Sequence, residues 1–200
     1  MKRDLRSFAS ATVLCIVAGC GGAGLDPDGG GGGGKSISTS AEAQAAFAAL
    51  KAASEFVDRQ ITANFTAPRS VSGAAGVATV TGRKTSSSTS TSSSTSTTKL
   101  SDLDLSFSGF QSSASGAQVS GRVSWYDYYY SRTACSVSTC ASASDHSEAL
   151  EGYSIQITFE YNGQKYSDQI SVDADSGADT SSWSVKLTSR SGQTFTFTYR

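Results

Sequence analysis

Apolar and polar residues alternate along this chain with two different periods, one helical and one extended. Across residues 39–65, apolar side chains recur at steps of three, four or seven positions, at Phe47, Leu50, Val57, Ile61 and Phe65. Residues at these steps share one face of an α-helix, so an amphipathic helix is predicted here. Ser40 is placed to cap its first turn, where Glu42 also suits the helix dipole.

After Pro68 the period changes to two, which is the pattern of strands that bury one face and expose the other. Seven runs show this pattern, the first of them weakly: 71–81, 103–107, 119–125, 153–161, 170–172, 183–187 and 195–199. In the fourth run one face is expected to carry Tyr153, Ile155, Ile157, Phe159 and Tyr161. Asn162-Gly163 predicts a tight hairpin, and the other links are also short. The runs therefore predict an antiparallel meander of six to seven strands.

A sheet with one apolar face requires a cover, and the helix provides it. We therefore expect one α+β domain over residues 36–200, with an N-terminal amphipathic helix packed on a twisted antiparallel meander sheet or on a partly closed barrel. Residues 85–98 are all serine or threonine. They offer no apolar face, so this segment is expected to be a flexible hairpin loop and not an extension of its flanking strands.

The first twenty residues follow a different pattern. Lys2, Arg3 and Arg6 precede the apolar stretch 8–17, which spans about 15 Å as a helix and is too short for a hydrocarbon layer of about 30 Å. The stretch ends in Val17-Ala18-Gly19-Cys20, which resembles the lipobox of bacterial lipoproteins. That resemblance implies that residues 1–19 are a signal peptide, and that cleavage leaves a thioether-linked diacylglycerol on Cys20.

The lipoprotein resemblance also implies a location. The mature chain is expected in the bacterial cell envelope, held to a membrane through the lipid on Cys20. Gly21 follows the cysteine in place of aspartate and resembles the pattern of lipoproteins sorted to the outer membrane. Residues 20–35 include six consecutive glycines, and they are expected to form a flexible tether with a reach of roughly 21 Å.

The net charge of the mature chain and its lack of catalytic motifs argue against two classes of function. Removing residues 1–19 takes three basic and one acidic residue from totals of 16 and 17, which leaves a net charge of −3. A mildly acidic domain binds phosphate backbones poorly, so no nucleic-acid partner is expected. The chain has no Gly-x-Ser-x-Gly elbow. Its glycine run is not expected to be a phosphate loop, because no strand pattern precedes it. We expect no catalytic residues, no cofactor and no enzymatic activity.

Two cysteines remain once Cys15 leaves with the signal peptide and Cys20 is lipidated. They are Cys135 and Cys140, and in an oxidising envelope they are predicted to form a disulfide that closes a small loop. A redox pair would normally have the Cys-x-x-Cys spacing, which this pair lacks.

His146, the only histidine, lies in a serine-rich segment and is expected on an exposed loop. A zinc site built from the two cysteines, His146 and either Glu148 or Asp145 would have one histidine and no second cysteine pair. The sequence therefore predicts no metal site.

Tyr126, Tyr128 and Tyr130 alternate with Trp125 and Tyr129. If Trp125 faces the core, the three tyrosines form a ladder on the polar face, where their rings could stack on sugars or on a partner protein. The alternative is that they stack across strands within the sheet.

Two functions fit these patterns. The first is a membrane-anchored envelope lipoprotein with a noncatalytic binding role toward an envelope protein or glycan, through the tyrosine ladder and the disulfide region. The second is a carrier or sensor of an apolar, lipid-like ligand held between helix and sheet, because many aromatic residues are predicted on buried faces. In outline, that arrangement resembles the lipoprotein carriers of outer-membrane sorting.

Overall fold

The computed structural model describes residues 34–65, 68–136, 138–177 and 181–200. The predicted signal peptide, the lipobox, the lipidation site at Cys20 and nearly all of the glycine-rich tether lie outside these ranges. Over the ranges described, the chain contains no helix with the length and apolar character needed to cross a membrane.

The predicted helix is α1 (Ser40–Gln60), and its first turn carries a capping box. Thr39, and not Ser40, is the cap: its hydroxyl accepts from the Glu42 backbone N–H, and the Glu42 carboxylate accepts from the Thr39 backbone N–H. The helix ends five residues earlier than expected, because Ile61 is extended and Asn64 adopts a φ of 59°. The buried helical face consists of Ala43, Ala46, Phe47, Leu50, Ala53, Ser54 and Val57.

The strands form one open antiparallel sheet in which each strand pairs with the next in sequence. They are β1 (Arg69–Ser72), β2 (Ala75–Ser90), β3 (Ser94–Gln111), β4 (Gln118–Cys135), β5 (Cys140–Tyr161), β6 (Gln164–Ser176), β7 (Trp183–Ser189) and β8 (Thr194–Tyr199). The meander is confirmed, but it has eight strands among the residues described. The run 71–81 divides into β1 and β2, because the chain turns at Gly73 and Ala74. Since β1 and β8 are separate edges, the partly closed barrel is wrong.

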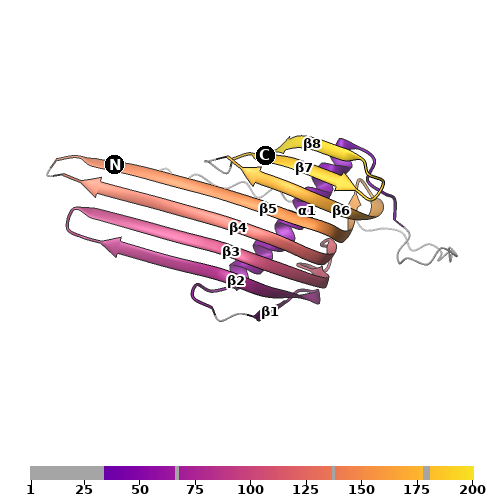
Figure 1. Ribbon diagram of the computed structural model, residues 1–200, viewed down its shortest axis with the longest axis horizontal. Helices are drawn as coiled ribbons and strands as arrows, with labels where there is room; N and C mark the ends of the chain where they lie inside the picture. Colours follow the sequence, from indigo (N-terminus) through magenta and orange to yellow (C-terminus); the bar gives the residue numbers. More distant parts are fainter. Residues whose placement is uncertain (1–33, 66–67, 137, 178–180) are drawn as a thin grey trace. The chain divides into compact units, whose positions relative to one another are not determined.

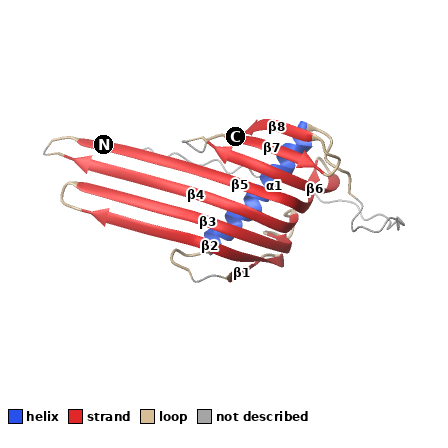
Figure 2. Cartoon of the chain, viewed as in Figure 1, coloured by secondary structure: helices blue, strands red, loops and turns tan. Residues whose placement is uncertain are grey.

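Helix α1 lies across one face of this sheet, and β2 to β5 continue well past it (Figures 1 and 2). The core lies between the two layers. Phe47 of α1 is fully buried, and its ring packs edge-on against Trp183, Phe197 and Tyr199 with centroids 5.2 to 6.3 Å apart. The predicted cover of the apolar face is thus confirmed.

The serine and threonine run at 85–98 is not a long loop, so that prediction is wrong. It forms the end of β2 and the start of β3, joined by a short turn at residues 91–93. The start of β3 also pairs with the end of β4, so its backbone is bonded on both sides. Threonine favours extended backbone, and these ladder bonds form without an apolar face.

Two bulges interrupt the register of the sheet. The pairing of β3 with both neighbours shifts by one residue at Gly109, and that of β5 shifts at Ser154. Both residues have positive φ, 59° and 55°. A bulge bends its strand and redirects the side chains beside it. Tyr153 consequently lies on the face opposite Ile155, which corrects the expectation that the two share a face.

Candidate functional site

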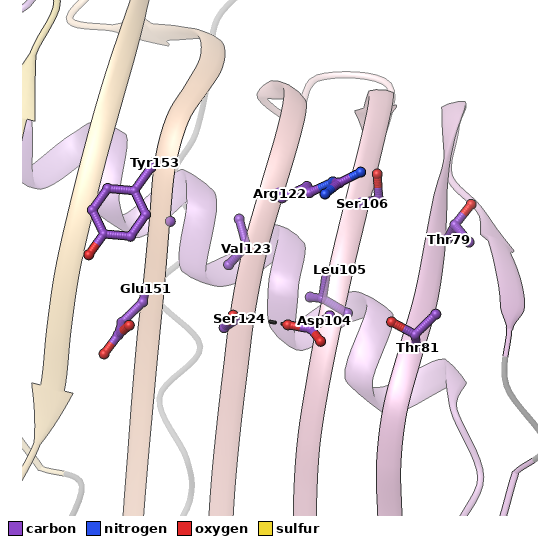
Figure 3. Close-up of a pocket in the computed structure, with 11 residues that line it drawn as sticks. Thr79, Thr81, Asp104, Leu105, Ser106, Arg122, Val123, Ser124, Glu151 and Tyr153 are labelled. Atoms are coloured by element: carbon purple, nitrogen blue, oxygen red, sulfur yellow. Dashed lines mark hydrogen bonds between the residues drawn. The ribbon is translucent and has the colours of Figure 1, made fainter.

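The sheet face opposite α1, called here the open face, contains a hollow of about 840 Å³. It spans β2 to β5, and most of the side chains that line it project away from the helix (Figure 3). Period-two alternation explains this placement, since the buried neighbours of these residues point toward α1. The side chains on the open face that line it are Thr79, Thr81, Asp104, Ser106, Arg122, Ser124, Glu151 and Tyr153.

Tyr153 is the aromatic member of the hollow, and 72% of its surface is exposed. The bulge at Ser154 is what brings it to this face. Serine at a φ of 55° is strained relative to glycine, and such backbone strain tends to occur at functional sites. The ring is therefore held in solvent next to polar neighbours, in a position where a ligand can cover it.

The polar groups of the hollow carry both signs of charge. Arg122 is the direct cross-strand neighbour of Tyr153, and Glu151 pairs with Ser124 in the next rung. The Ser124 hydroxyl donates to Asp104 Oδ1 at 3.0 Å. The hollow thus combines an exposed ring at one edge with a guanidinium, two carboxylates and several hydroxyls, which suits a neutral ligand that both donates and accepts hydrogen bonds.

The three tyrosines of the predicted ladder lie on the open face, as their alternation with Trp125 indicated. Trp125 is 2% exposed, whereas Tyr126 is 38% exposed. The residues directly opposite the three on β3 and β5 are not aromatic: Asp102, Leu100, Thr98, Ala149, Ser147 and Asp145. Cross-strand aromatic stacking therefore does not account for them. The ladder continues β4 beyond Ser124, so it extends the hollow along the same face.

The predicted disulfide between Cys135 and Cys140 is confirmed. It links β4 directly to β5, because the two cysteines are the last paired residues of these strands. The bond thus lies at the tip of the long hairpin. The hollow is lined farther along these strands, at residues 122–124 and 151–153.

His146 is not on an exposed loop, so that expectation is wrong. It lies on β5, where its ring contacts Asp127 Oδ1 at 3.0 Å and packs edge-on against Tyr129. Alternation places Asp145 and Ser147 on the other face, which separates them from the imidazole. The cysteines are bonded to each other, so the zinc set considered from the sequence is not assembled.

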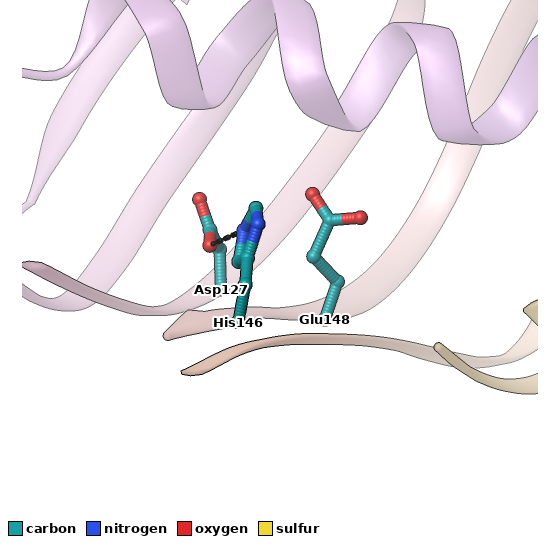
Figure 4. A group of neighbouring side chains, drawn as sticks. All are labelled: Asp127, His146 and Glu148. Carbon is teal, nitrogen blue, oxygen red and sulfur yellow. Dashed lines mark hydrogen bonds and ion pairs between the residues drawn. The ribbon is translucent and has the colours of Figure 1, made fainter. Parts of the chain in front are cut away.

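The helix-side face instead brings Asp127, His146 and Glu148 together (Figure 4). All three project from the sheet toward the side on which α1 lies. Burial raises the pKa of the Glu148 carboxyl, against the opposing effect of Lys51, whose Nζ lies 4.0 Å away. This cluster was missed because the distance between Asp127 and His146 depends on the register of two strands.

The space between α1 and the sheet is occupied by packed side chains among the residues described. Phe47 fills it near β7 and β8, while Phe56 and Phe107 contact Phe110 near β3. This packing gives the carrier hypothesis no support, because that hypothesis requires room for a ligand there.

No protein-family model matches this chain, and no curated protein or solved structure matches it either.

The hollow itself was also missed from the sequence. The available signal was Gly109 and Gly152, which lie close to the predicted runs 103–107 and 153–161, since an isolated glycine in a strand often marks a bulge.

Proposed function

We propose that this protein is a lipid-anchored, noncatalytic binding domain of the bacterial envelope, which captures a glycan at the hollow on its open face. The lipid on Cys20 and the glycine-rich tether hold the domain near a membrane. The hollow supplies the contact surface, and the tyrosine ladder lengthens it for an extended ligand.

The observation that supports this proposal is the exposure of Tyr153 in a hollow that Arg122, Asp104 and Glu151 also line. Folding ordinarily favours the burial of a large aromatic ring, and here a strained bulge keeps one in solvent. A sugar presents an apolar C–H face and a rim of hydroxyl groups. The ring would cover the first, and the charged and hydroxyl groups would bond the second.

The test is a binding measurement with the full chain and immobilised envelope polysaccharide. Tyr153→Ala and Glu151→Gln are expected to weaken binding at least tenfold, which corresponds to about 1.4 kcal/mol. Glu160→Gln is the matched control, because Glu160 is exposed on the same strand and does not line the hollow. Its binding is expected to equal that of the wild type.

Two results would count against the proposal. Equal binding by Tyr153→Ala and the wild type would remove the hollow from the site. Binding to envelope proteins but not to polysaccharide would exchange the glycan for a protein partner. A double variant, Tyr126→Ala with Tyr128→Ala, then shows whether the ladder contributes to either contact.

The lipid anchor has a separate test. Mass spectrometry of the mature chain from a bacterial host is expected to show an N-terminal cysteine with diacylglycerol attached at its sulfur. Cys20→Ser is expected to lose the lipid and the membrane association together. A mature N-terminus elsewhere, or an unmodified Cys20, would refute the anchor.

A further inference from the structure

The helix-side face of β4 and β5 contains a group of metal-ligating side chains that the proposed function does not use. Asp127 is directly opposite Glu148, and His146 lies two residues before Glu148 on the same strand face. One potential ligand atom from each residue lies within 4.8 Å of those from the other two. Figure 4 shows the three side chains projecting side by side from the sheet.

We infer that Asp127, His146 and Glu148 form a binding site for a divalent transition-metal ion of the zinc type. Imidazole nitrogen with carboxylate oxygen is a donor set that zinc accepts, with bonds of about 2.0 to 2.2 Å. Two ligand atoms of a tetrahedral zinc are then about 3.3 Å apart. Asp127 Oδ1 and His146 Nε2 are already separated by 3.0 Å, so small side-chain rotations complete the set.

Charge supports the same assignment. A metal is bound by ionised carboxylates and neutral imidazole, so the three ligands together would carry a charge of −2, which a divalent ion balances. The carboxyl-bearing side chains are 30% and 14% exposed, for Asp127 and Glu148 respectively, so solvent screens them incompletely. The three residues would leave a fourth coordination position for water or another ligand.

Lys51 of α1 contacts the cluster through Glu148, and its positive charge opposes metal binding. Its Nζ lies 4.0 Å from Glu148 Oε2, and it also pairs with Glu55 on the same helix. Lys51 is not a ligand, so its removal should strengthen metal binding. This expected increase in affinity distinguishes a metal site in the folded protein from metal binding by the unfolded chain.

The experiment is calorimetric titration of the full chain with Zn²⁺ at neutral pH, after treatment with a chelator. One ion per chain is expected. His146→Gln, Asp127→Asn and Glu148→Gln should each weaken binding at least about tenfold. Asp145→Asn is the matched control, because Asp145 is adjacent in sequence but faces the other side of the sheet. Lys51→Gln should bind Zn²⁺ severalfold more tightly than the wild type.

Far-ultraviolet circular dichroism checks that each variant retains its fold. Absence of Zn²⁺ binding to the wild-type chain would overturn the inference, as would binding that survives His146→Gln or falls equally with Asp145→Asn. Stronger binding of Ca²⁺ than of Zn²⁺ would also contradict it, since calcium prefers oxygen ligands alone. The site is on the face opposite the hollow, so its failure leaves the glycan proposal intact.

Discussion

Glu42 joins the start of α1 to the sheet, and Glu42→Gln is predicted to destabilise the fold in a manner that depends on pH. Its Oε2 accepts from the Ser38 and Thr39 backbone N–H groups at 2.8 and 2.9 Å and from the Ser38 hydroxyl at 3.0 Å. Its Oε1 accepts from the Tyr166 hydroxyl at 2.8 Å. The substitution keeps the shape of the side chain but removes the charge and half of its acceptors.

The magnitude follows from the same contacts. Burial raises the pKa of Glu42, but hydrogen bonds from the Ser38 backbone, the Tyr166 and Ser38 hydroxyls and the Thr39 backbone together lower it from 4.5 to about 2. Without solvent screening that shift would correspond to about 3 kcal/mol. Because the carboxylate is partly exposed, we expect the free energy of unfolding to fall by about 1 to 2 kcal/mol at neutral pH.

The direction of the pH dependence is fixed by the lowered pKa. A carboxyl with a depressed pKa in the folded state stabilises the fold above its unfolded pKa, and this contribution is lost as pH falls from 4.5 toward 2. The difference between wild type and Glu42→Gln should therefore shrink to less than half at pH of about 3.

The assay is urea unfolding followed by tryptophan fluorescence, since Trp125 and Trp183 are both buried. Measurements at neutral pH and at pH of about 3 give the two differences. Glu160→Gln serves as the control for loss of an exposed carboxylate on a strand. A deficit in Glu42→Gln that is the same at both pH values, or absent at neutral pH, would refute the reasoning.

Three further substitutions probe the rest of the fold. Asp168 is 1% exposed and accepts hydrogen bonds from the backbone N–H groups of residues 37, 169 and 190. Asp168→Asn should therefore lower the free energy of urea unfolding by about 2 to 3 kcal/mol and hasten amide exchange at residue 37, and unchanged exchange would contradict this. Phe47→Ala should lower the free energy of urea unfolding by about 3 to 5 kcal/mol, because it leaves a cavity at the centre of the aromatic cluster. A loss under about 1 kcal/mol would mean that this cluster is not the core. Cys135→Ser with Cys140→Ser should lower the free energy of unfolding by only about 2 kcal/mol and leave the circular dichroism spectrum unchanged, since the bond closes a short loop between strands that are already paired. Loss of the sheet signal would show instead that the disulfide holds the sheet together.

The helix and the meander were predictable because an element that buries one face has apolar residues that recur with the period of that element. Phe47, Leu50 and Val57 are buried at helical spacing, and Leu103, Leu105 and Phe107 are buried at strand spacing. These patterns depend only on local geometry. They therefore survive without knowledge of which strand lies next to which.

The serine and threonine strands were not predictable in this way. Residues 85–98 bury no apolar face. They are ordered by backbone pairing between β2 and β3, and their β3 part also pairs with β4 on its other side. Hydroxyl contacts across strands, such as that between Ser90 and Thr95, add to it. Pairing between distant segments leaves no periodic signature in either one.

Both candidate sites depend on register, which the sequence does not display. One extra residue at Ser154 moves Tyr153 to the open face and creates the aromatic wall of the hollow. Likewise, Asp127 reaches His146 only because β4 and β5 pair with Asp127 opposite Glu148. A shift of one residue would place these side chains on opposite faces.

The most direct test of the binding site is a nuclear magnetic resonance titration of the isotope-labelled full chain with soluble fragments of envelope polysaccharide. The account predicts that amide shifts cluster at Thr81, Arg122 and Tyr153 and continue toward Tyr126, with the helix-side face unchanged. Shifts confined to the surroundings of α1 or to the tip of the β4–β5 hairpin, or no shifts at saturating fragment, would contradict it.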